Sequence, residues 1–273
     1  MPLEVRSLAE WEADFVAGML SVVIPAYNEE GRIEQTVRDL HTALAQAGVL
    51  HEILVINDSS RDGTEAVLKG LQQEIATLRY VNNAPPNGFG YAVRAGLTAF
   101  HGEAVAIVMA DGSDLPEDLV AFYRKLEEGY ECVFGSRFMH GARVVNYPLP
   151  KLVLNRLANF FIRTLFWMKY NDVTNAFKLY RRSVIAGVQP LLSYHFNLTV
   201  ELPLKAIVRG YSYAVVPTSW LNRTAGVSKF KVKEMGSRYL FIVLYCYLEK
   251  YLMREDYRKR ADLREGQLQV WSR

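Results

Sequence analysis

Polar side chains cluster directly after three short apolar runs of the chain, at the points where a parallel sheet presents groups to a ligand. The turns are Pro25-Ala26-Tyr27-Asn28-Glu29, Asn57 to Thr64 (NDSSRDGT) and Ala110-Asp111-Gly112-Ser113-Asp114. A ligand in an open parallel sheet binds beyond the carboxyl ends of the strands, so these residues are the first candidates for chemistry. The first turn has no G-x-G-x-x-G spacing, which argues against a dinucleotide-binding Rossmann domain.

The elements that must position these turns can be read from the hydrophobic pattern. Short β-branched runs alternate with helical patterns, which predicts an α/β fold with a mainly parallel, twisted sheet flanked by helices. The predicted strands are residues 21–25, 52–57, 78–81, 104–109 and 131–135. Glu29 and Glu30 favour a helix N-terminus after the first strand, and Gly48 favours the end of that helix. Gly88-Phe89-Gly90 predicts a turn that starts another helix.

The chain becomes rich in aromatic residues at helical spacing from about Lys151 onward. Residues 155–170 carry Leu157, Phe161, Leu165 and Met168 at this spacing, which predicts a helix that buries this face in the core. The apolar run from Tyr239 to Leu248 is bracketed by Arg238 and Glu249 and falls short of the roughly 20 apolar residues that span a bilayer. We therefore expect this run to be buried in a core or to lie in a membrane interface.

The ordered set of polar turns, followed by Gly135-Ser136-Arg137, resembles the inverting family 2 glycosyltransferases with the GT-A nucleotide-sugar fold. The resemblance is closest to dolichyl-phosphate and undecaprenyl-phosphate sugar synthases. Asp172 to Lys178 (DVTNAFK) is similar to the family's D-x-T-x-G-F segment, with Ala176 where glycine is usual. Arg223 to Lys229 (RTAGVSK) is similar to its R-x-x-G-x-S-K loop.

The resemblance implies a nucleotide-diphosphate sugar as donor, of the GDP-mannose or UDP-hexose type. The residues that would bind it are Pro25, Tyr27, Glu29, Ile56, Asp58, Ala110, Arg223 and Lys229. Glu29 would accept hydrogen bonds from ribose hydroxyls, while Ile56 and Asp58 would contact the nucleobase. Arg223 and Lys229 would place two cations near phosphates. The alternatives are an ordinary acid in the first turn of a helix for Glu29 and a solvated basic loop for the two cations.

The resemblance also implies four catalytic residues, which are Asp111, Arg137, Asp172 and Glu201. Asp111 would hold a divalent cation, Mg²⁺ or Mn²⁺, because a departing nucleoside diphosphate needs its developing charge neutralised. Ser113 would add an oxygen ligand or, alternatively, cap the next helix. Arg137 would neutralise the leaving diphosphate, and Asp172 and Glu201 would lie near the acceptor. Plain turn or helix acids are the alternatives for Asp111, Asp172 and Glu201.

The chain departs from the family at its metal motif. D-x-D is usual there, whereas this chain has Met109-Ala110-Asp111, so the first carboxylate is missing. Most of the coordination must then come from the donor diphosphate and water, as is common for magnesium bound together with phosphates. The same departure makes a catalytically silent member an alternative. Asn57 replaces the first residue of the family's double aspartate, while Asp58 is retained.

The implied reaction is a single in-line displacement at the anomeric carbon, with inversion, onto a polyprenyl phosphate. Such an acceptor is already anionic and needs no strong general base. A rival is a family 2 transferase that acts on a sugar hydroxyl in surface-polysaccharide or glycolipid assembly, for which Asp172 or Glu201 would be the base. A non-catalytic nucleotide-sugar-binding protein is the alternative from another class, motivated by Met109.

Composition and charge indicate where the protein works. The 273 residues carry a net charge of +3, too small to argue for nucleic acid. The acidic N-terminus lacks a secretory signal pattern, and Cys132 and Cys246 resemble neither a disulfide framework nor a zinc site, which predicts a cytosolic protein. Basic residues between Arg223 and Arg238 precede the apolar run and predict peripheral attachment to the inner face of a membrane. The predicted organisation is an N-terminal extension (1–18), a GT-A domain (19–235) and an amphipathic, membrane-interfacial segment (236–273).

Overall fold

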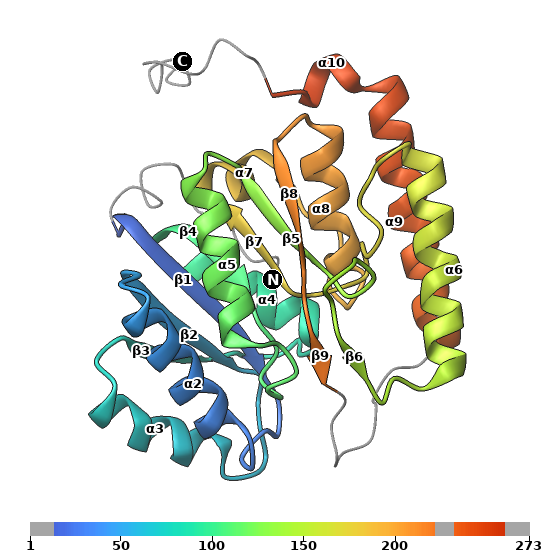
Figure 1. Cartoon of the computed structure of the whole chain (residues 1–273). Coiled ribbons are helices and arrows are strands. Elements are labelled where there is room, and N and C mark those ends of the chain that lie inside the picture. Colours follow the sequence, from blue (N-terminus) through green and yellow to red (C-terminus); the bar gives the residue numbers. More distant parts are fainter. Residues whose placement is uncertain (1–13, 222–231, 260–273) are drawn as a thin grey trace.

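A seven-stranded sheet forms the centre of the computed structural model, which describes residues 14–221 and 232–259 (Figure 1). The strand order is β3-β2-β1-β4-β7-β5-β8. These strands are β1 (Val16–Ala26), β2 (His51–Asn57), β3 (Leu78–Asn82), β4 (Gly102–Ile107), β5 (Cys132–Ser136), β7 (Lys178–Arg181) and β8 (Tyr213–Pro217). β7 runs antiparallel to β4 and β5, whereas the other pairs in this sheet are parallel. The five predicted strands are all present, which confirms the mainly parallel α/β architecture.

Helices cover both faces of the sheet (Figure 1). They are α2 (Ile33–Gln46), α3 (Thr64–Glu74), α4 (Phe89–Ala99), α5 (Pro116–Glu127), α6 (Leu149–Phe166), α7 (Arg182–Gly187), α8 (Leu198–Val208), α9 (Val232–Leu252) and α10 (Arg254–Tyr257). A separate two-stranded sheet pairs β6 (Val144–Val145) with β9 (Trp220–Leu221). As predicted, Gly88 precedes α4 in a turn.

Alternate residues of each strand belong to two separate cores, because successive side chains of a strand point to opposite faces of the sheet. Val23 and Leu54 belong to one core, together with side chains of α4, α7, α8 and α9. Val22 and Ile53 belong to the other, together with side chains of α2, α3 and α5. Burial on both faces explains why the strands read as continuous apolar runs in the sequence.

Helix α6 turns its apolar face away from the core. Leu157 and Phe161 are 61% and 50% exposed, whereas Asn159, Ile162 and Phe166 are buried. The prediction of a core-facing side is therefore wrong for Leu157 and Phe161, but it is confirmed for Leu165, which packs against the core, and for Met168, which is buried. The reason is that α6 lies at the outer side of the molecule, where it contacts its neighbours through the opposite face (Figure 1).

Helix α9 is buried on one side and exposed on the other. Ile242, Val243 and Cys246 are buried, while apolar side chains such as Leu240 and Leu244 are exposed. The buried side is fixed to α8 by an ion pair between Arg209 and Glu249, in which each side chain is 2% exposed and Nε lies 2.7 Å from Oε1. No helix within the described residues is long and apolar enough to cross a membrane.

The domain boundaries at residues 18/19 and 235/236 stay predictions. The first strand begins at Val16, ahead of the first of these boundaries, and α9 extends across the second.

Candidate active site

One edge of the central sheet collects most of the predicted site residues that the structure describes. The turns after β1, β2, β4 and β5 lie there because these strands are parallel. β7 runs the other way, so the residues that precede it, 171–177, reach the same edge between the ends of β4 and β5. The Asp111 turn, Arg137 and Asp172 thus come together although they are far apart in sequence.

Reciprocal hydrogen bonds join the turns after β1 and β2. The backbone N–H of Asn28 donates to Ser60 Oγ (3.0 Å), and the N–H of Arg61 donates to Asn28 Oδ1 (2.8 Å). The N–H of Glu29 donates to Thr64 Oγ1 (2.9 Å). Two loops that would otherwise be independent are therefore held as one rim of the predicted nucleotide pocket.

The predicted nucleotide-binding residues of these turns differ in accessibility. Pro25 and Ile56 are buried, Glu29 is half-buried and Tyr27 is exposed. Contacts between these four residues and a nucleotide stay predictions.

Asp58 is buried and its carboxylate organises the loop before α4. Oδ1 accepts hydrogen bonds from the side-chain amides of Asn83 (2.7 Å) and Asn87 (3.0 Å), and Oδ2 accepts one from the backbone N–H of Gly88 (2.7 Å). Gly88 has a φ of 136°, a conformation that favours glycine. The carboxylate thus fixes the loop before α4, and its predicted contact with the nucleobase stays a prediction.

The turn after β4 is held by its own acidic side chains. Asp111 Oδ1 accepts a hydrogen bond from the N–H of Ser113 (3.0 Å), and Asp114 Oδ2 accepts one from the N–H of Met109 (3.0 Å). From α2, Thr36 Oγ1 donates to the carbonyl of Ala110 (3.0 Å). Asp114 is buried, and burial raises its pKa to about 7.

The composition of this turn fits a cation that is bound mainly by the donor. Asp111 is partly exposed at the strand end, whereas Ser113 is 3% exposed. No group of three or more His, Cys, Asp or Glu in the described ranges could hold a metal ion. A hard divalent cation commonly uses one or two carboxylates and takes its remaining ligands from phosphates and water. Asp111 therefore suits a cation that binds together with a diphosphate.

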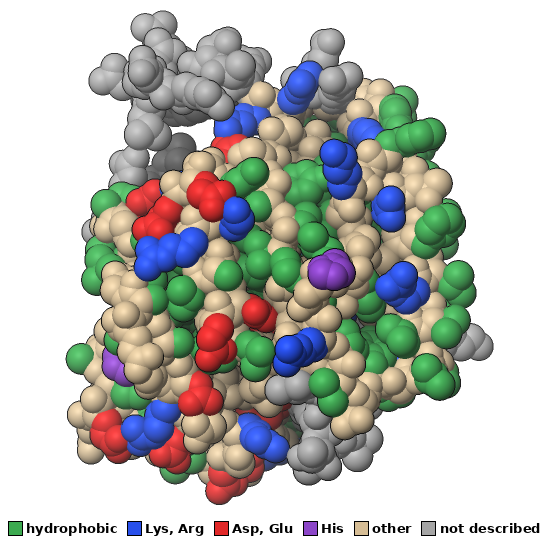
Figure 2. All heavy atoms as spheres, in the orientation of Figure 1, with side chains coloured by type: hydrophobic (Ala, Val, Ile, Leu, Met, Phe, Trp, Pro, Cys, Tyr) green, Lys and Arg blue, Asp and Glu red, His purple; other side chains and the backbone are tan. Residues whose placement is uncertain are grey.

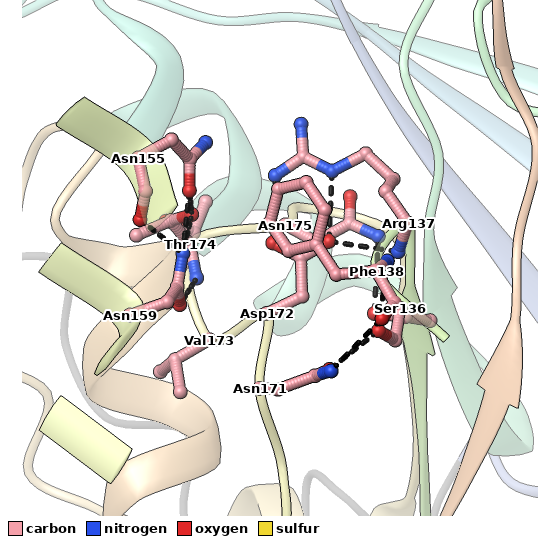
Figure 3. Close-up of polar contacts among 12 residues, drawn as sticks. Ser136, Arg137, Phe138, Asn155, Asn159, Asn171, Asp172, Val173, Thr174 and Asn175 are labelled. Carbon is pink, nitrogen blue, oxygen red and sulfur yellow. Dashed lines mark hydrogen bonds and ion pairs between the residues drawn. The ribbon is translucent and has the colours of Figure 1, made fainter. Parts of the chain in front are cut away.

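Arg137 is clamped by Asp172 (Figure 3). The Nε of Arg137 donates to Asp172 Oδ2 (2.8 Å), Nη2 donates to Oδ1 (2.7 Å), and the backbone N–H donates to Oδ2 (2.9 Å). The two side chains are 9% and 0% exposed. Burial by itself would lower the pKa of Arg137, but the Asp172 carboxylate outweighs this effect and holds that pKa above its usual value. The guanidinium therefore stays charged in a fixed orientation.

Aromatic rings surround the same guanidinium. Its central carbon lies 5.4 Å from the ring centre of Phe138 and 5.8 Å from that of Tyr147. The Tyr147 ring in turn contacts Trp220 of β9, with ring centres 4.9 Å apart. An isolated bridge between Trp220 and Asp114 connects β9 to the Asp111 turn. Through Trp220, the β6–β9 sheet is therefore connected both to the surroundings of Arg137 and to the Asp111 turn.

Lys178, which is 1% exposed, supports the turn that carries Asp172 through hydrogen bonds to backbone carbonyls. Its Nζ donates to the carbonyls of Val173 (3.0 Å) and Thr199 (3.0 Å) and to that of Asn175. Burial lowers the pKa of Lys178 to about 7, against the opposing attraction of the Asp172 carboxylate. Lys178 thus connects the turn to the start of α8.

Two amide side chains, the buried Asn159 and the partly exposed Asn155, connect α6 to the same turn (Figure 3). The Nδ2 of Asn159 donates to Thr174 Oγ1 (3.0 Å), and the Thr174 hydroxyl donates to Asn155 Oδ1 (2.9 Å). The Nδ2 of Asn155 also donates to the Tyr147 hydroxyl (3.1 Å). Thr174 is two residues from Asp172, so α6 helps to fix the backbone that holds the Arg137 clamp.

Glu201 lies inside the protein, in contact with a loop of the same chain. It is 0% exposed and accepts hydrogen bonds from the N–H groups of Leu192 and Ser193, both at 2.7 Å. Lys205 Nζ lies 2.8 Å from its Oε1. The structure therefore places Glu201 in a supporting position, and its predicted role near the acceptor stays a prediction. Arg223 and Lys229 lie outside the described residues.

Sequence reasoning assigned no role to several residues that shape this site, namely Asp114, Tyr147, Asn155, Asn159, Lys178 and Trp220. One of them gave a signal, because Asn159 is a short amide on a helix where Ile162 and Phe166 mark the buried face. The partners of Trp220 come from distant segments and have no local signature. Lys178 bonds two carbonyls of its own preceding turn, and only its bond to Thr199 reaches a distant segment.

Comparison with known proteins agrees with this geometry. Residues 21–188 match the model of the Glycosyl transferase family 2. A polyprenol monophosphomannose synthase from Mycolicibacterium smegmatis is 32% identical over 233 residues, which cover 80% of this chain and 86% of that protein. A dolichol-phosphate mannosyltransferase from Pyrococcus furiosus is 27% identical over 218 residues, covering 78% of this chain but 60% of that longer protein.

Solved structures show the same fold. Glucosyl-3-phosphoglycerate synthase from Mycobacterium tuberculosis, in complex with Mn²⁺, UDP and glucosyl-3-phosphoglycerate, superposes with a TM-score of 0.63 at 20% identity, over 90% of this chain and 84% of that one. The same enzyme with Mg²⁺ and UDP gives a TM-score of 0.61 at 20% identity, over 90% of this chain and 84% of that one. These likenesses show the GT-A fold, and with the family match they establish that the chain belongs to the family 2 glycosyltransferases.

Proposed function

We propose that this glycosyltransferase moves a hexosyl group from a nucleotide-diphosphate sugar, of the GDP-mannose or UDP-hexose type, to a polyprenyl phosphate, with inversion at the anomeric carbon. The names of its relatives in Mycolicibacterium and Pyrococcus support a polyprenyl phosphate as the class of acceptor. The observation that carries the proposal is the burial and hydrogen bonding of Asp172 and Glu201, the two carboxylates that would serve as a general base.

Asp172 and Glu201 are both buried with their oxygens engaged. Asp172 accepts three hydrogen bonds from Arg137, and Glu201 binds two backbone N–H groups and Lys205. A sugar hydroxyl must lose a proton during transfer and needs an accessible base, whereas a lipid phosphate is already ionised. The engagement of both carboxylates therefore favours a phosphate acceptor over a hydroxyl acceptor.

Catalysis would then consist of positioning and charge neutralisation. Arg137, held by Asp172, would face the phosphates, and Arg223 and Lys229 would add two more cations. A divalent cation at Asp111 and Ser113 would supply positive charge to the leaving diphosphate. Pro25, Tyr27, Glu29, Ile56, Asp58 and Ala110 would hold the nucleoside part of the donor.

Residues 236–273 would attach the enzyme peripherally to the inner face of a membrane, where a polyprenyl phosphate resides. Support comes from α9, whose exposed side carries Leu240, Phe241, Leu244 and Leu248. An apolar helix face in the acyl boundary and cations near anionic headgroups reinforce one another.

The direct test is transfer of label into an organic phase. The purified enzyme is incubated with labelled GDP-mannose or a labelled UDP-hexose, MgCl₂ and undecaprenyl phosphate. Matched reactions replace the acceptor with undecaprenol, which has a hydroxyl in place of the phosphate, or with soluble oligosaccharides. We expect extractable label with the phosphate only, and a product whose anomeric configuration is opposite to that of the donor.

The alternatives give distinct results. Transfer to oligosaccharides but not to the lipid phosphate would favour the rival that acts on a sugar hydroxyl. Donor binding without turnover on any acceptor would favour a non-catalytic binding protein. A product that retains the donor configuration would overturn the inverting displacement alone.

A further inference from the structure

Helix α6 presents a long apolar surface to solvent. Its exposed large hydrophobic residues are Leu149, Val153, Leu154, Leu157, Phe160 and Phe161, and Trp167 follows the helix at 87% exposure. Scattered apolar residues are normal on a protein surface, but a contiguous apolar patch marks a site of interaction. The spacing of these residues along the helix makes the patch contiguous.

Helix α9 continues this surface. The two helices lie side by side (Figure 1), and their C-terminal ends are joined where Lys250 Nζ donates to the carbonyl of Phe166 (2.7 Å). The Phe166 and Tyr247 rings also meet edge to face, with centres 6.2 Å apart. Because α9 exposes Leu240, Phe241, Leu244, Leu248 and Leu252, the two helices together form one apolar face. We call it the α6–α9 face.

The exposed charges on α6, and on α9 from Arg238 onward, are basic. Lys151, Arg156 and Arg163 lie on α6, which has no acidic residue, and the one acid of α9 beyond Arg238 is Glu249, buried against Arg209. Figure 2 shows basic and hydrophobic side chains intermingled on the side where α6 lies, while acidic side chains gather on the opposite half of the view. Phe, Leu and Trp side chains flanked by cations are typical of helices that lie in the plane of an anionic membrane surface.

We propose that α6 is a lipid-contacting helix and that the α6–α9 face rests on an anionic bilayer. This extends membrane contact from the C-terminal segment to a second helix, which also touches the catalytic centre. Arg156 of α6 lies over the Phe138 ring, at 4.9 Å from its centre, and Phe138 follows Arg137. The lipid surface would therefore lie beside the Arg137 clamp, where an acceptor phosphate is to be received, and in this respect the inference rests on the proposed function.

Vesicle binding tests the surface without donor or acceptor. The full-length chain is sedimented with vesicles of phosphatidylglycerol and phosphatidylcholine, and with vesicles of phosphatidylcholine alone. The α6 variant carries Leu157→Gln, Phe160→Gln and Phe161→Gln, and the α9 variant carries Leu240→Gln, Phe241→Gln and Leu244→Gln. Leu50→Gln, which changes an exposed leucine immediately before β2, is the control. Circular dichroism and thermal melting check that each variant is folded.

We expect wild type and Leu50→Gln to bind the anionic vesicles more tightly than the neutral ones. Each triple variant should bind at least about tenfold more weakly, because apolar contact sets much of the affinity of an interfacial helix. An α6 variant that binds like wild type would overturn the role of α6. The wild-type chain could instead fail to bind vesicles and self-associate, while the α6 variant is monomeric. That result would overturn the proposal, because the α6–α9 face would then contact a second copy of the chain and not lipid.

Transfer assays separate this inference from the proposed function. The α6 variant should lose transfer to undecaprenyl phosphate in vesicles but keep transfer to a short, water-soluble prenyl phosphate. Loss with both acceptors would show that the substitutions damage the site and would contradict a role limited to lipid contact. Absence of transfer by wild type with either acceptor would reject the proposed function, whereas vesicle binding would still decide the role of the α6–α9 face.

A second inference comes from the opposite face of α6. Asn159 is 2% exposed, and with Asn155 it bonds Thr174, two residues from Asp172. The hydroxyl and the backbone N–H of Thr174 are both hydrogen-bonded to α6, since the N–H donates to Asn159 Oδ1 (3.3 Å). We infer that Thr174 is a positioning residue, which transmits the location of α6 to the Arg137 clamp.

A matched pair of substitutions tests this role. Thr174→Val removes the hydroxyl but keeps the shape, whereas Thr174→Ser keeps the hydroxyl. We expect Thr174→Val to lower kcat about tenfold or more with little change in the donor KM, and Thr174→Ser to restore most of the rate. Equal rates for the two variants, or a change confined to the donor KM, would overturn the assignment.

Discussion

The carboxylate of Asp172 accepts three hydrogen bonds from a single residue, Arg137, across 35 positions of sequence. Both side chains are buried, so neither charge is compensated by water. The pair therefore keeps the guanidinium in one orientation at the sheet edge that also carries the Asp111 turn.

Asp172→Asn should lower both activity and stability, because it leaves the charge of Arg137 buried without its partner. Breaking a buried ion pair costs about 3–5 kcal/mol, and we expect a fall in the free energy of unfolding toward that range. Turnover should fall even where the variant is folded. Urea unfolding and transfer rates below the melting transition measure the two effects. Wild-type turnover in a folded Asp172→Asn variant would contradict the positioning of Arg137 by Asp172.

Asp111→Asn should abolish transfer and leave the fold intact, since a partly exposed turn residue contributes little to stability. The expected loss in kcat is at least about a hundredfold, as for removal of one strong electrostatic stabiliser. The matched control is Asp39→Asn on the exposed side of α2, which should behave like wild type. Turnover of Asp111→Asn close to that of the control would remove Asp111 from the mechanism.

Met109→Asp should increase the affinity for Mn²⁺ in the absence of donor, because it adds the carboxylate that the D-x-D motif normally supplies. Methionine sulfur is a soft ligand and does not replace a carboxylate for a hard cation. In wild type, Mn²⁺ should bind well only together with the nucleotide sugar. Titration calorimetry with and without donor measures this. Tight binding of Mn²⁺ to the wild-type apo protein, or full transfer in excess chelator, would contradict the prediction.

Arg223→Ala and Lys229→Ala should each raise the donor KM or slow transfer, since both cations are predicted to face phosphate. Lys125→Ala, on the exposed surface of α5, removes the same charge away from the site and serves as the control. Steady-state kinetics with varied donor distinguish the two effects. Unchanged constants in both loop variants would identify 223–229 as a solvated surface loop.

Glu52 should give the protein a stability that depends on pH. Burial acts to raise the pKa of Glu52, but hydrogen bonds from Ser21 and the His101 N–H and the charge of Arg79 outweigh burial and lower it below 4.5. The folded state therefore binds this proton less readily than the unfolded state. The stabilisation is present above about pH 4.5 and is lost as the pH falls through the lowered pKa.

Glu52→Gln should accordingly lose about 1–2 kcal/mol of unfolding free energy at neutral pH and much less in acid. Urea unfolding at pH 7 and at about pH 3.5 measures the difference. Transfer activity should not change, because Glu52 is at the start of β2, away from the catalytic edge. An equal loss of stability at both pH values would show that shape rather than charge matters at this position.

The parallel part of the sheet could be predicted because its strands are buried on both faces and read as apolar runs. β7 could not, since its four residues KLYR include two cations, one of which is the buried Lys178. Asp111, Arg137 and Asp172 were predicted to be site residues from their motifs, and these roles stay predictions. Their relationship was not predictable, because the clamp depends on an antiparallel strand that brings residue 172 beside residue 137.

Two other features depend on tertiary packing. Helical spacing showed that Leu157 and Phe161 share one face of a helix, but spacing does not say whether that face meets a core or an outer surface. The motif of Glu201 predicts a place near the acceptor, which stays a prediction, but it does not reveal the contacts of Glu201 with Leu192, Ser193 and Lys205.

The buried pair of Arg209 and Glu249 bears on how a soluble form of this enzyme should be made. Shortening the chain before Arg238 would remove Glu249 and leave Arg209 as an uncompensated charge inside the protein. That cost, about 3–5 kcal/mol, is a large part of the roughly 5–15 kcal/mol that holds a typical domain folded. A shortened chain found in the soluble or the aggregated fraction would report on damage rather than on membrane release. Material for solution work should therefore retain all of α9 and carry polar side chains at exposed positions such as Leu240, Leu244 and Leu248.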